Sequence, residues 1–163
     1  ILVGGLGFGD AAARELGKRV AQLEELQRLL LILQGEIRCV RLTLPAVCEL
    51  LAKDAKAPFQ QFFWKVSEDL GKRTGQTAGE IWSRNLKEIQ KLLFLTKKEQ
   101  QDLEEFGQLL GRMDMPMQLS AIQFYQEKIM LSLAEAKAAA DSRQKLYRYL
   151  GALGGAALVL VIM

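Results

Sequence analysis

The residue types that carry most protein chemistry are sparse in this sequence and poorly placed for it. There is no histidine among the 163 residues, so the commonest general base and the commonest metal ligand are both missing. The two cysteines, Cys39 and Cys48, do not have the C-x2-C spacing of a zinc or redox site. Both fall at apolar positions of helical patterns, which predicts buried thiols. A disulfide between neighbouring helices is the alternative.

The carboxylates are arranged for solvent rather than for catalysis. Acid–base chemistry requires acids from separate elements to converge in a buried place. The acidic clusters fall on the expected outer faces of helices: Glu24–Glu25, Glu68–Asp69, Asp102, Glu104–Glu105. We therefore expect a protein that is not an enzyme and uses no metal, cofactor or small-molecule substrate.

Two glycine-rich stretches lack the spacing of phosphate-binding loops. In "GGLGFGD", the third glycine of G-x-G-x-x-G would fall on Asp10, and no strand precedes it. In "GKRTGQT", no Ser or Thr follows Lys72. The net charge of +3 is small, and no basic stripe alternates with aromatic residues. Nucleic acid is therefore not an expected partner.

The apolar periodicity predicts an all-α fold in a single domain. No run of alternating β-branched residues is bounded by turns, whereas leucines recur at steps of three and four from Leu23 onward. Three prolines precede apolar runs as helix starts, and two Thr-x-x-Glu stretches match the capping box. We expect about six helices in an antiparallel bundle with long first and last helices, starting near Asp10, Pro45, Pro58, Thr77, Thr96 and Asp114.

Both ends of the chain are uncharged, which raises the question of a membrane. Each run is shorter than the roughly 20 apolar residues that span a bilayer. Antiparallel long helices would nevertheless bring the two ends together, and basic residues flank each one as they flank cytoplasmic interfaces. We expect residues 1–9 to end an N-terminal membrane segment, 10–148 to form a cytoplasmic helical domain, and 149–163 to form a C-terminal membrane segment.

Glycines four residues apart allow helices to approach closely. Gly5 and Gly9, and Gly151 and Gly155, would do so between apolar helices in lipid. We expect Gly107 and Gly111 to face another helix at close range inside the soluble bundle.

Two stretches resemble the stage III sporulation protein AB family. "LQGEIRCVRLTLPAVCELLA" matches its E-I-x-x-x-x-T-P-L-x-x-A region through Glu36, Ile37, Thr43 and Pro45, although the family's T-P-L is Thr-Leu-Pro in this chain. "LEEFGQLLGRMDMPMQ" matches its LG-x-x-LG-x-x-D-x-x-x-Q region at the following residues: Gly107, Leu110, Gly111, Asp114, Gln118. The resemblance covers essentially the whole chain.

The resemblance implies a non-enzymatic, membrane-anchored assembly platform. This family is encoded with proteins that build the channel between mother cell and forespore, and it is similar to the inner-membrane platforms of type II secretion and type IV pilus systems. It implies a cytoplasmic assembly ATPase and membrane ring proteins as partners. It also places the chain in the mother-cell membrane around the forespore, with the helical domain in the cytoplasm.

The matched residues are the candidate protein-interaction site, at the bundle tip far from the membrane: Glu36, Thr43, Pro45, Gly107, Gly111, Asp114, Gln118. The alternative is that these residues only cap and pack helices. Two other functional classes stay open: a helical ligand-sensing domain of a two-span receptor, and a soluble helical adaptor with buried ends. The basic flanks argue against the receptor, whose domain would lie outside the membrane.

Overall fold

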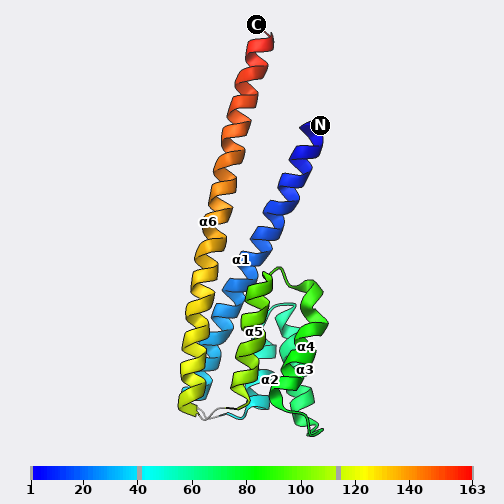
Figure 1. Ribbon diagram of the computed structural model, residues 1–163, viewed down its shortest axis with the longest axis vertical. Coiled ribbons are helices and arrows are strands. Elements are labelled where there is room, and N and C mark those ends of the chain that lie inside the picture. The colour runs from blue at the N-terminus through cyan, green and yellow to red at the C-terminus, as the bar shows by residue number, and fades with distance from the viewer. Residues whose placement is uncertain (1, 40–41, 113–114, 163) are drawn as a thin grey trace.

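The computed structural model describes residues 2–39, 42–112 and 115–162, and in these ranges it is helical with short connections (Figure 1). The expected all-α fold is confirmed. The elements follow in this order: α1 (Leu2–Cys39), α2 (Leu44–Asp54), α3 (Phe59–Gly71), α4 (Ala78–Ile89), the 3-10 turn η1 (Gln90–Leu92), α5 (Lys97–Leu110) and α6 (Met115–Ile162).

The two long helices, α1 and α6, pack antiparallel, and α2–α5 form a compact lobe against one end of the pair. Figure 1 shows both long helices projecting beyond the lobe at the same end of the molecule, α6 farther than α1. The expectation that both chain ends emerge at one pole is therefore confirmed for the described parts of these helices. We call the opposite end, where α1 leads to α2 and α5 to α6, the tip.

Local sequence signals start α2 to α6 where expected, whereas α1 begins at Leu2 rather than near Asp10, because the uncharged residues before Asp10 continue the helix. Thr77 Oγ1 accepts a hydrogen bond from the Glu80 backbone N–H at 3.2 Å, and the Glu80 carboxylate accepts one from the Thr77 N–H at 2.8 Å. Thr96 and Glu99 repeat this reciprocal cap at the start of α5. The prolines lie at the starts of α2, α3 and α6, where a missing N–H removes no helical hydrogen bond.

The core lies between the lobe and the adjoining halves of α1 and α6. An aromatic chain runs through it, in which Trp82 contacts Phe62, Phe63 and Phe106 edge to face, and Phe106 stacks on Tyr125. The predicted inward positions of α1, α4 and α6 are largely confirmed as buried: Leu23, Leu26, Leu30, Leu33, Ile37, Trp82, Leu86, Ile89, Leu93, Ile122, Ile129, Leu133, Ala136.

Polar ties attach the lobe to α1. Arg19 Nη2 lies 2.6 Å from Glu99 Oε1, which joins α1 to the start of α5. The Gln22 amide donates to the Leu92 carbonyl at 2.9 Å and accepts from the Phe94 N–H at 2.8 Å. These bonds satisfy backbone groups in the connection between α4 and α5, so they fix its position.

Three side chains depart from the sequence expectations. Cys39 is exposed, because it ends α1 beyond Ile37, the last buried position of that helix. Glu25 is buried rather than facing water, and Arg28 together with the Lys56 backbone N–H satisfies its carboxylate. Leu109, expected to face inward, is 39% exposed.

The far half of α6 is exposed along its whole described length. Every residue from 141 to 162 is exposed. Among the described residues, one helix is long and apolar enough to cross a membrane, Pro116–Ile162, and none of its most apolar window is buried in protein. The N-terminal membrane segment expected at residues 1–9 stays a prediction.

Candidate interaction surface

The buried acids of this fold are paired and do not form a reactive cluster. Within the described ranges, no three His, Cys, Asp or Glu side chains lie close enough together to hold a metal ion. Burial would raise the pKa of Glu99, but hydrogen bonds from Arg19 and the Thr96 backbone outweigh it and lower that pKa. Hydrogen bonds from Asn85 and Arg84 lower the pKa of Asp69 to about 2. These carboxylates are charged structural ties at neutral pH rather than proton donors.

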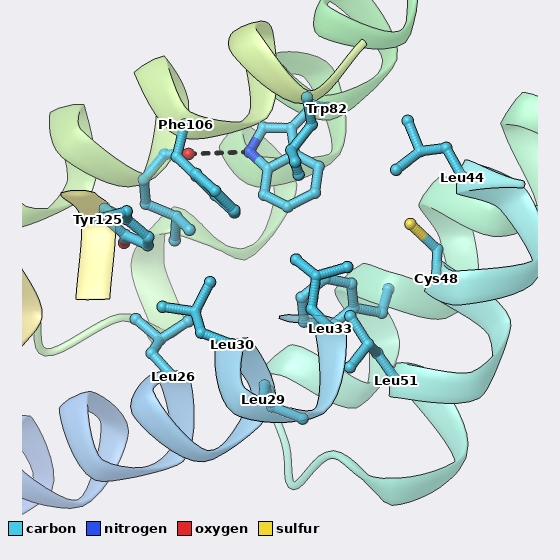
Figure 2. Close-up of a pocket in the computed structure, with 13 residues that line it drawn as sticks. Leu26, Leu29, Leu30, Leu33, Leu44, Cys48, Leu51, Trp82, Phe106 and Tyr125 are labelled. Carbon is cyan, nitrogen blue, oxygen red and sulfur yellow. Dashed lines mark hydrogen bonds between the residues drawn. The ribbon is translucent and has the colours of Figure 1, made fainter. Parts of the chain in front are cut away.

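The apolar seam at the centre of the molecule is packed rather than open (Figure 2). It lies where Leu26, Leu30 and Leu33 of α1 face Trp82 and Phe106, and its volume is about 10 Å³, close to the minimum for one water molecule. The Trp82 indole N–H is satisfied by the Leu103 carbonyl at 3.0 Å. The seam is therefore core packing and offers no ligand site.

Cys48 and Tyr125 border this seam, and neither is poised to react. Burial raises the pKa of the Cys48 thiol to about 12 and raises the pKa of Tyr125 well above its ordinary value. A neutral buried thiol behaves as a small apolar side chain. The prediction that Cys48 is a buried thiol is confirmed.

The two glycines of the family-like stretch on α5 serve close packing against α4, as predicted. A Cβ at Gly107 would lie 2.2 Å from atoms of the Trp82 ring. A Cβ at Gly111 would lie 2.6 Å from the Ala78 Cβ. Both contacts hold the start of α4 against the end of α5.

The other matched residues divide between packing and surface. The Gln118 amide donates to the Leu110 carbonyl at 2.8 Å and so closes the end of α5. The Pro45 carbonyl accepts from the Ser67 hydroxyl at 3.0 Å, which ties α2 to α3. Thr43 precedes α2 as an exposed N-cap without a side-chain cap bond.

The two remaining matched residues, Glu36 and Asp114, provide no test of the interaction hypothesis. Glu36 is half-buried near the end of α1, and its side chain forms no ion pair within the described part of the chain. Asp114 lies outside the described residues. The tip as an interaction surface stays a prediction, carried by Glu36 and Thr43.

An exposed apolar patch on the side of the long-helix pair was not anticipated from the sequence. It consists of Phe124, Met130 and Leu131 on α6 and Leu31 on α1, each 56–69% exposed. We call it the α6 patch. Single exposed apolar residues are ordinary, but a cluster of large ones marks a contact surface.

The geometry of the antiparallel pair brings the members of the α6 patch together. Glu24 of α1 and Lys137 of α6 form an ion pair at 2.8 Å. Leu31 follows Glu24 by two helical turns, and Met130 precedes Lys137 by two turns, so both lie along the same edge of the pair. Leu131 and Phe124 continue the patch around the outer side of α6, where the Lys128 ammonium lies over the Phe124 ring.

A second apolar period along α6 was the signal for this patch. Met117, Phe124 and Leu131 recur at intervals of seven residues, on the face opposite the buried positions Ile122 and Ile129. One stripe packs in the core and the other stays exposed. The predicted core of α6 was based only on the first stripe.

Comparisons with known proteins agree with one another. The model of the family described as stage III sporulation protein AB matches residues 1–163. A similar relative, stage III sporulation protein AB of Bacillus subtilis (strain 168), is 29% identical over 155 residues, covering 95% of this chain and 90% of the relative. A similar solved structure, of stage III sporulation protein AB (SpoIIIAB), has a TM-score of 0.69 at 28% identity, covering 76% of this chain and 97% of that one.

Proposed function

This chain belongs to the stage III sporulation protein AB family, and on that premise we propose that it is a non-enzymatic, membrane-anchored assembly platform of the channel between mother cell and forespore. In this role it holds partners in place at the membrane, as the platforms of secretion and pilus systems do. It sits in the mother-cell membrane around the forespore with its helical bundle in the cytoplasm.

The observation that supports the proposal is the continuity of α6. One unbroken helix packs into the core near the tip and then continues as an exposed, uncharged run after Arg148. An exposed apolar helix is costly in water and stable in lipid. Because α6 is one continuous helix, it holds the lobe at a fixed distance and orientation from the bilayer.

The basic residues near this transition support a cytoplasmic lobe. Arg143, Lys145 and Arg148 come just before the apolar run, and all three are exposed. Lys and Arg are enriched on the cytoplasmic side of membrane segments. We therefore assign the lobe, and everything on its side of Arg148, to the cytoplasm.

Two surfaces are available for the two expected kinds of partner. We assign the tip, with Glu36 and Thr43, to the cytoplasmic assembly ATPase, because the tip is the part of the bundle farthest from the membrane end of α6. We assign the α6 patch to a membrane ring protein, because the helix that carries the patch continues into the bilayer where ring proteins lie.

The test is co-purification of the full chain with each partner from detergent-solubilised membranes. Leu131→Glu places a charge in the α6 patch, and it should release the ring protein while the ATPase is retained. Glu36→Gln removes a charge at the tip, and it should weaken retention of the ATPase while the ring protein stays. Thermal unfolding should be unchanged in both variants, since neither residue is buried.

Leu92→Glu is the matched control, because Leu92 is also a large exposed leucine, 52% accessible, but lies in η1 outside both surfaces. It should retain both partners. Retention of both partners by Leu131→Glu and Glu36→Gln would refute the assignment of these surfaces.

A further inference from the structure

A crevice opens between the two long helices beyond the lobe, on the side of the molecule where α6 continues into its apolar run. Ala13 and Leu16 of α1 and Ala140 of α6 form its apolar lining, and its volume is about 450 Å³. The crevice belongs to neither the α6 patch nor the tip. Nothing in the proposed platform role requires it to be there.

A close contact above the crevice limits it. Tyr147 of α6 lies across α1 at Gly9, where a Cβ would be only 1.8 Å from the tyrosine hydroxyl oxygen. Below the crevice, the fully buried Ala136 marks where the helices pack into the core. The space is therefore a bounded notch rather than a simple widening between diverging helices.

Two arginines line the crevice. Arg143 and Arg148 of α6 both contribute to it, and neither forms an ion pair within the described part of the chain. The acid that precedes the crevice on α1, Asp10, is paired with Arg14 at 2.6 Å. The crevice therefore combines an apolar lining with two arginines that are free to bind an anion.

The position of the crevice along α6 matches a bilayer boundary. Arg148 is the last charged residue, and the uncharged run begins at the next residue, Tyr149. Tyrosines and basic residues in this order are typical of the headgroup layer. If α6 crosses the membrane as proposed, the crevice opens at the depth of the lipid phosphates.

We propose that this crevice binds one anionic phospholipid, with its headgroup in the crevice beside Ala13, its phosphate between Arg143 and Arg148, and the upper part of its acyl chains along the apolar run of α6 that begins at Tyr149. Guanidinium groups recognise phosphate through paired hydrogen bonds, and basic pockets between membrane helices select anionic headgroups. The inference rests on the proposed function only in requiring α6 to cross a bilayer.

The apolar run beside the crevice distinguishes a lipid from a free anion. Inorganic phosphate would contact only the two arginines. A phospholipid also places its acyl chains against the exposed apolar surface of α6 after Arg148, so its affinity draws on burial of apolar surface as well as on charge.

The experiment counts lipids retained by the full chain. The purified chain in neutral detergent is titrated with phosphatidylglycerol or with phosphatidylcholine of the same acyl chains, and bound lipid is counted by native mass spectrometry. Wild type should retain one phosphatidylglycerol and much less phosphatidylcholine. Arg143→Gln combined with Arg148→Gln should weaken phosphatidylglycerol binding roughly 30-fold, because each basic residue near an anionic headgroup contributes about 1 kcal/mol.

Two further variants make the result specific. Arg38→Gln with Arg112→Gln removes the same charge from exposed positions at the tip, and it should bind phosphatidylglycerol as wild type does. Ala13→Leu fills the crevice without changing charge and should weaken binding. All variants should keep the helical circular dichroism and partner retention of wild type, so a failure of the lipid site is distinguishable from a failure of the platform role.

Four results would overturn the inference. Equal retention of the two lipids would remove the anionic selectivity, and unchanged binding in the double Arg143 and Arg148 variant would remove the site. Full displacement of phosphatidylglycerol by inorganic phosphate, or an Ala13→Leu variant that binds normally, would show a surface charge effect rather than a crevice that accepts a lipid.

Discussion

From Pro116 to Ala140, α6 alternates buried and exposed positions, whereas from Asp141 to Ile162 every position is exposed. The first half is amphipathic and packs against α1 and α5, as a helix at the surface of a globular core does. The second half is apolar on all sides after Arg148, and each of its described positions is exposed. We call these halves the packed half and the projecting half of α6.

If α6 crosses the membrane as proposed, this difference means that one helix meets two solvents. The packed half follows the 3.6-residue period because one face meets protein and the other meets water. A helix that is apolar all round needs an apolar surrounding on every side, which a bilayer provides and water does not. The transition lies among the basic residues and tyrosines at the boundary, so sequence and packing change together.

The largest expected effect is the insertion of a charge into the projecting half. Leu158→Arg should cost about 2.5–3.5 kcal/mol of membrane insertion, because an arginine near the middle of a bilayer helix carries that penalty. Leu146→Arg is the matched control: it is similarly exposed but lies before Arg148, and it should change insertion by less than about 0.5 kcal/mol.

Flotation of the chain with phosphatidylcholine vesicles measures this difference. If Leu158→Arg floats with the vesicles as completely as Leu146→Arg does, the projecting half does not lie in lipid, and the comparison between the two halves fails.

A methyl group at Gly107 should have the next largest effect, a loss of folding stability. Comparing it with a glycine that has open space around it contrasts the packed core with a projecting helix. Gly107→Ala should destabilise the chain by about 1–3 kcal/mol, because the new Cβ meets the Trp82 ring and overpacks the core. Gly17→Ala, on α1 beyond the lobe with open space around it, should instead gain up to about 1 kcal/mol from helix propensity.

Urea unfolding of the full chain in detergent, followed by tryptophan fluorescence, compares the two glycine variants. Opposite signs are the expected outcome. Equal stabilisation by both substitutions would mean that the contact between Gly107 and Trp82 is loose.

Removing the capping residues of the lobe helices α4 and α5 should reduce folding stability by a smaller amount. Thr77→Ala and Thr96→Ala should each cost about 1 kcal/mol, because each removes the side-chain acceptor for an otherwise unpaired N–H. Ser142→Ala, an exposed position in the projecting half of α6, should be neutral within about 0.5 kcal/mol. Urea midpoints of the three variants provide the measurement, and a neutral Thr77→Ala would contradict the cap assignment.

The smallest expected effect is a pH dependence confined to the lobe. The folded-state pKa of Asp69 is about 2, below its ordinary value of 3.8, so its carboxylate stabilises the fold fully above about pH 4. That contribution is lost as the pH falls toward 2. Because Arg84 is partly solvated, the loss should be a few tenths to about 1 kcal/mol.

Asp69→Asn is the variant that isolates this contribution. Its urea midpoint should fall less than that of wild type between pH 4 and pH 2.5, since no carboxylate is left to titrate at this position. Parallel pH profiles for the two proteins would show that the interactions of Asp69 with Asn85 and Arg84 contribute nothing measurable.

The core could be predicted from the sequence because burial on a helix follows a fixed period. Leu23, Leu26, Leu30 and Leu33 were assigned to one face from their spacing, and all four are buried. The capping boxes were equally readable, since a Thr and a Glu three residues apart satisfy each other locally.

What could not be predicted depends on contacts between distant segments. Glu25 is buried because the Lys56 backbone N–H arrives from the connection between α2 and α3, which no local pattern of α1 encodes. The close packing of Gly107 and Gly111 was predicted from their spacing, but Trp82 and Ala78 could not be named as their neighbours, because only the tertiary fold brings α4 against α5. A motif shared within a family marks positions where few residue types are tolerated. In this chain, helix packing accounts for much of that restriction.

The most direct test of the two-solvent account is a spin-label scan along α6 of the full chain in vesicles. Single cysteines are introduced one at a time from residue 117 to 160 in a chain with Cys39 and Cys48 replaced by alanine. The accessibility of each label to oxygen, which enters lipid, and to a water-soluble nickel reagent is then compared.

The account predicts a 3.6-residue period of nickel accessibility from residue 117 to about residue 140, because one face of the packed half meets water. From residue 151 onward, oxygen accessibility should exceed nickel accessibility at every position. A helical period that continues unchanged through residues 151–160, or high nickel accessibility there, would contradict the claim that α6 passes from the bundle into the membrane.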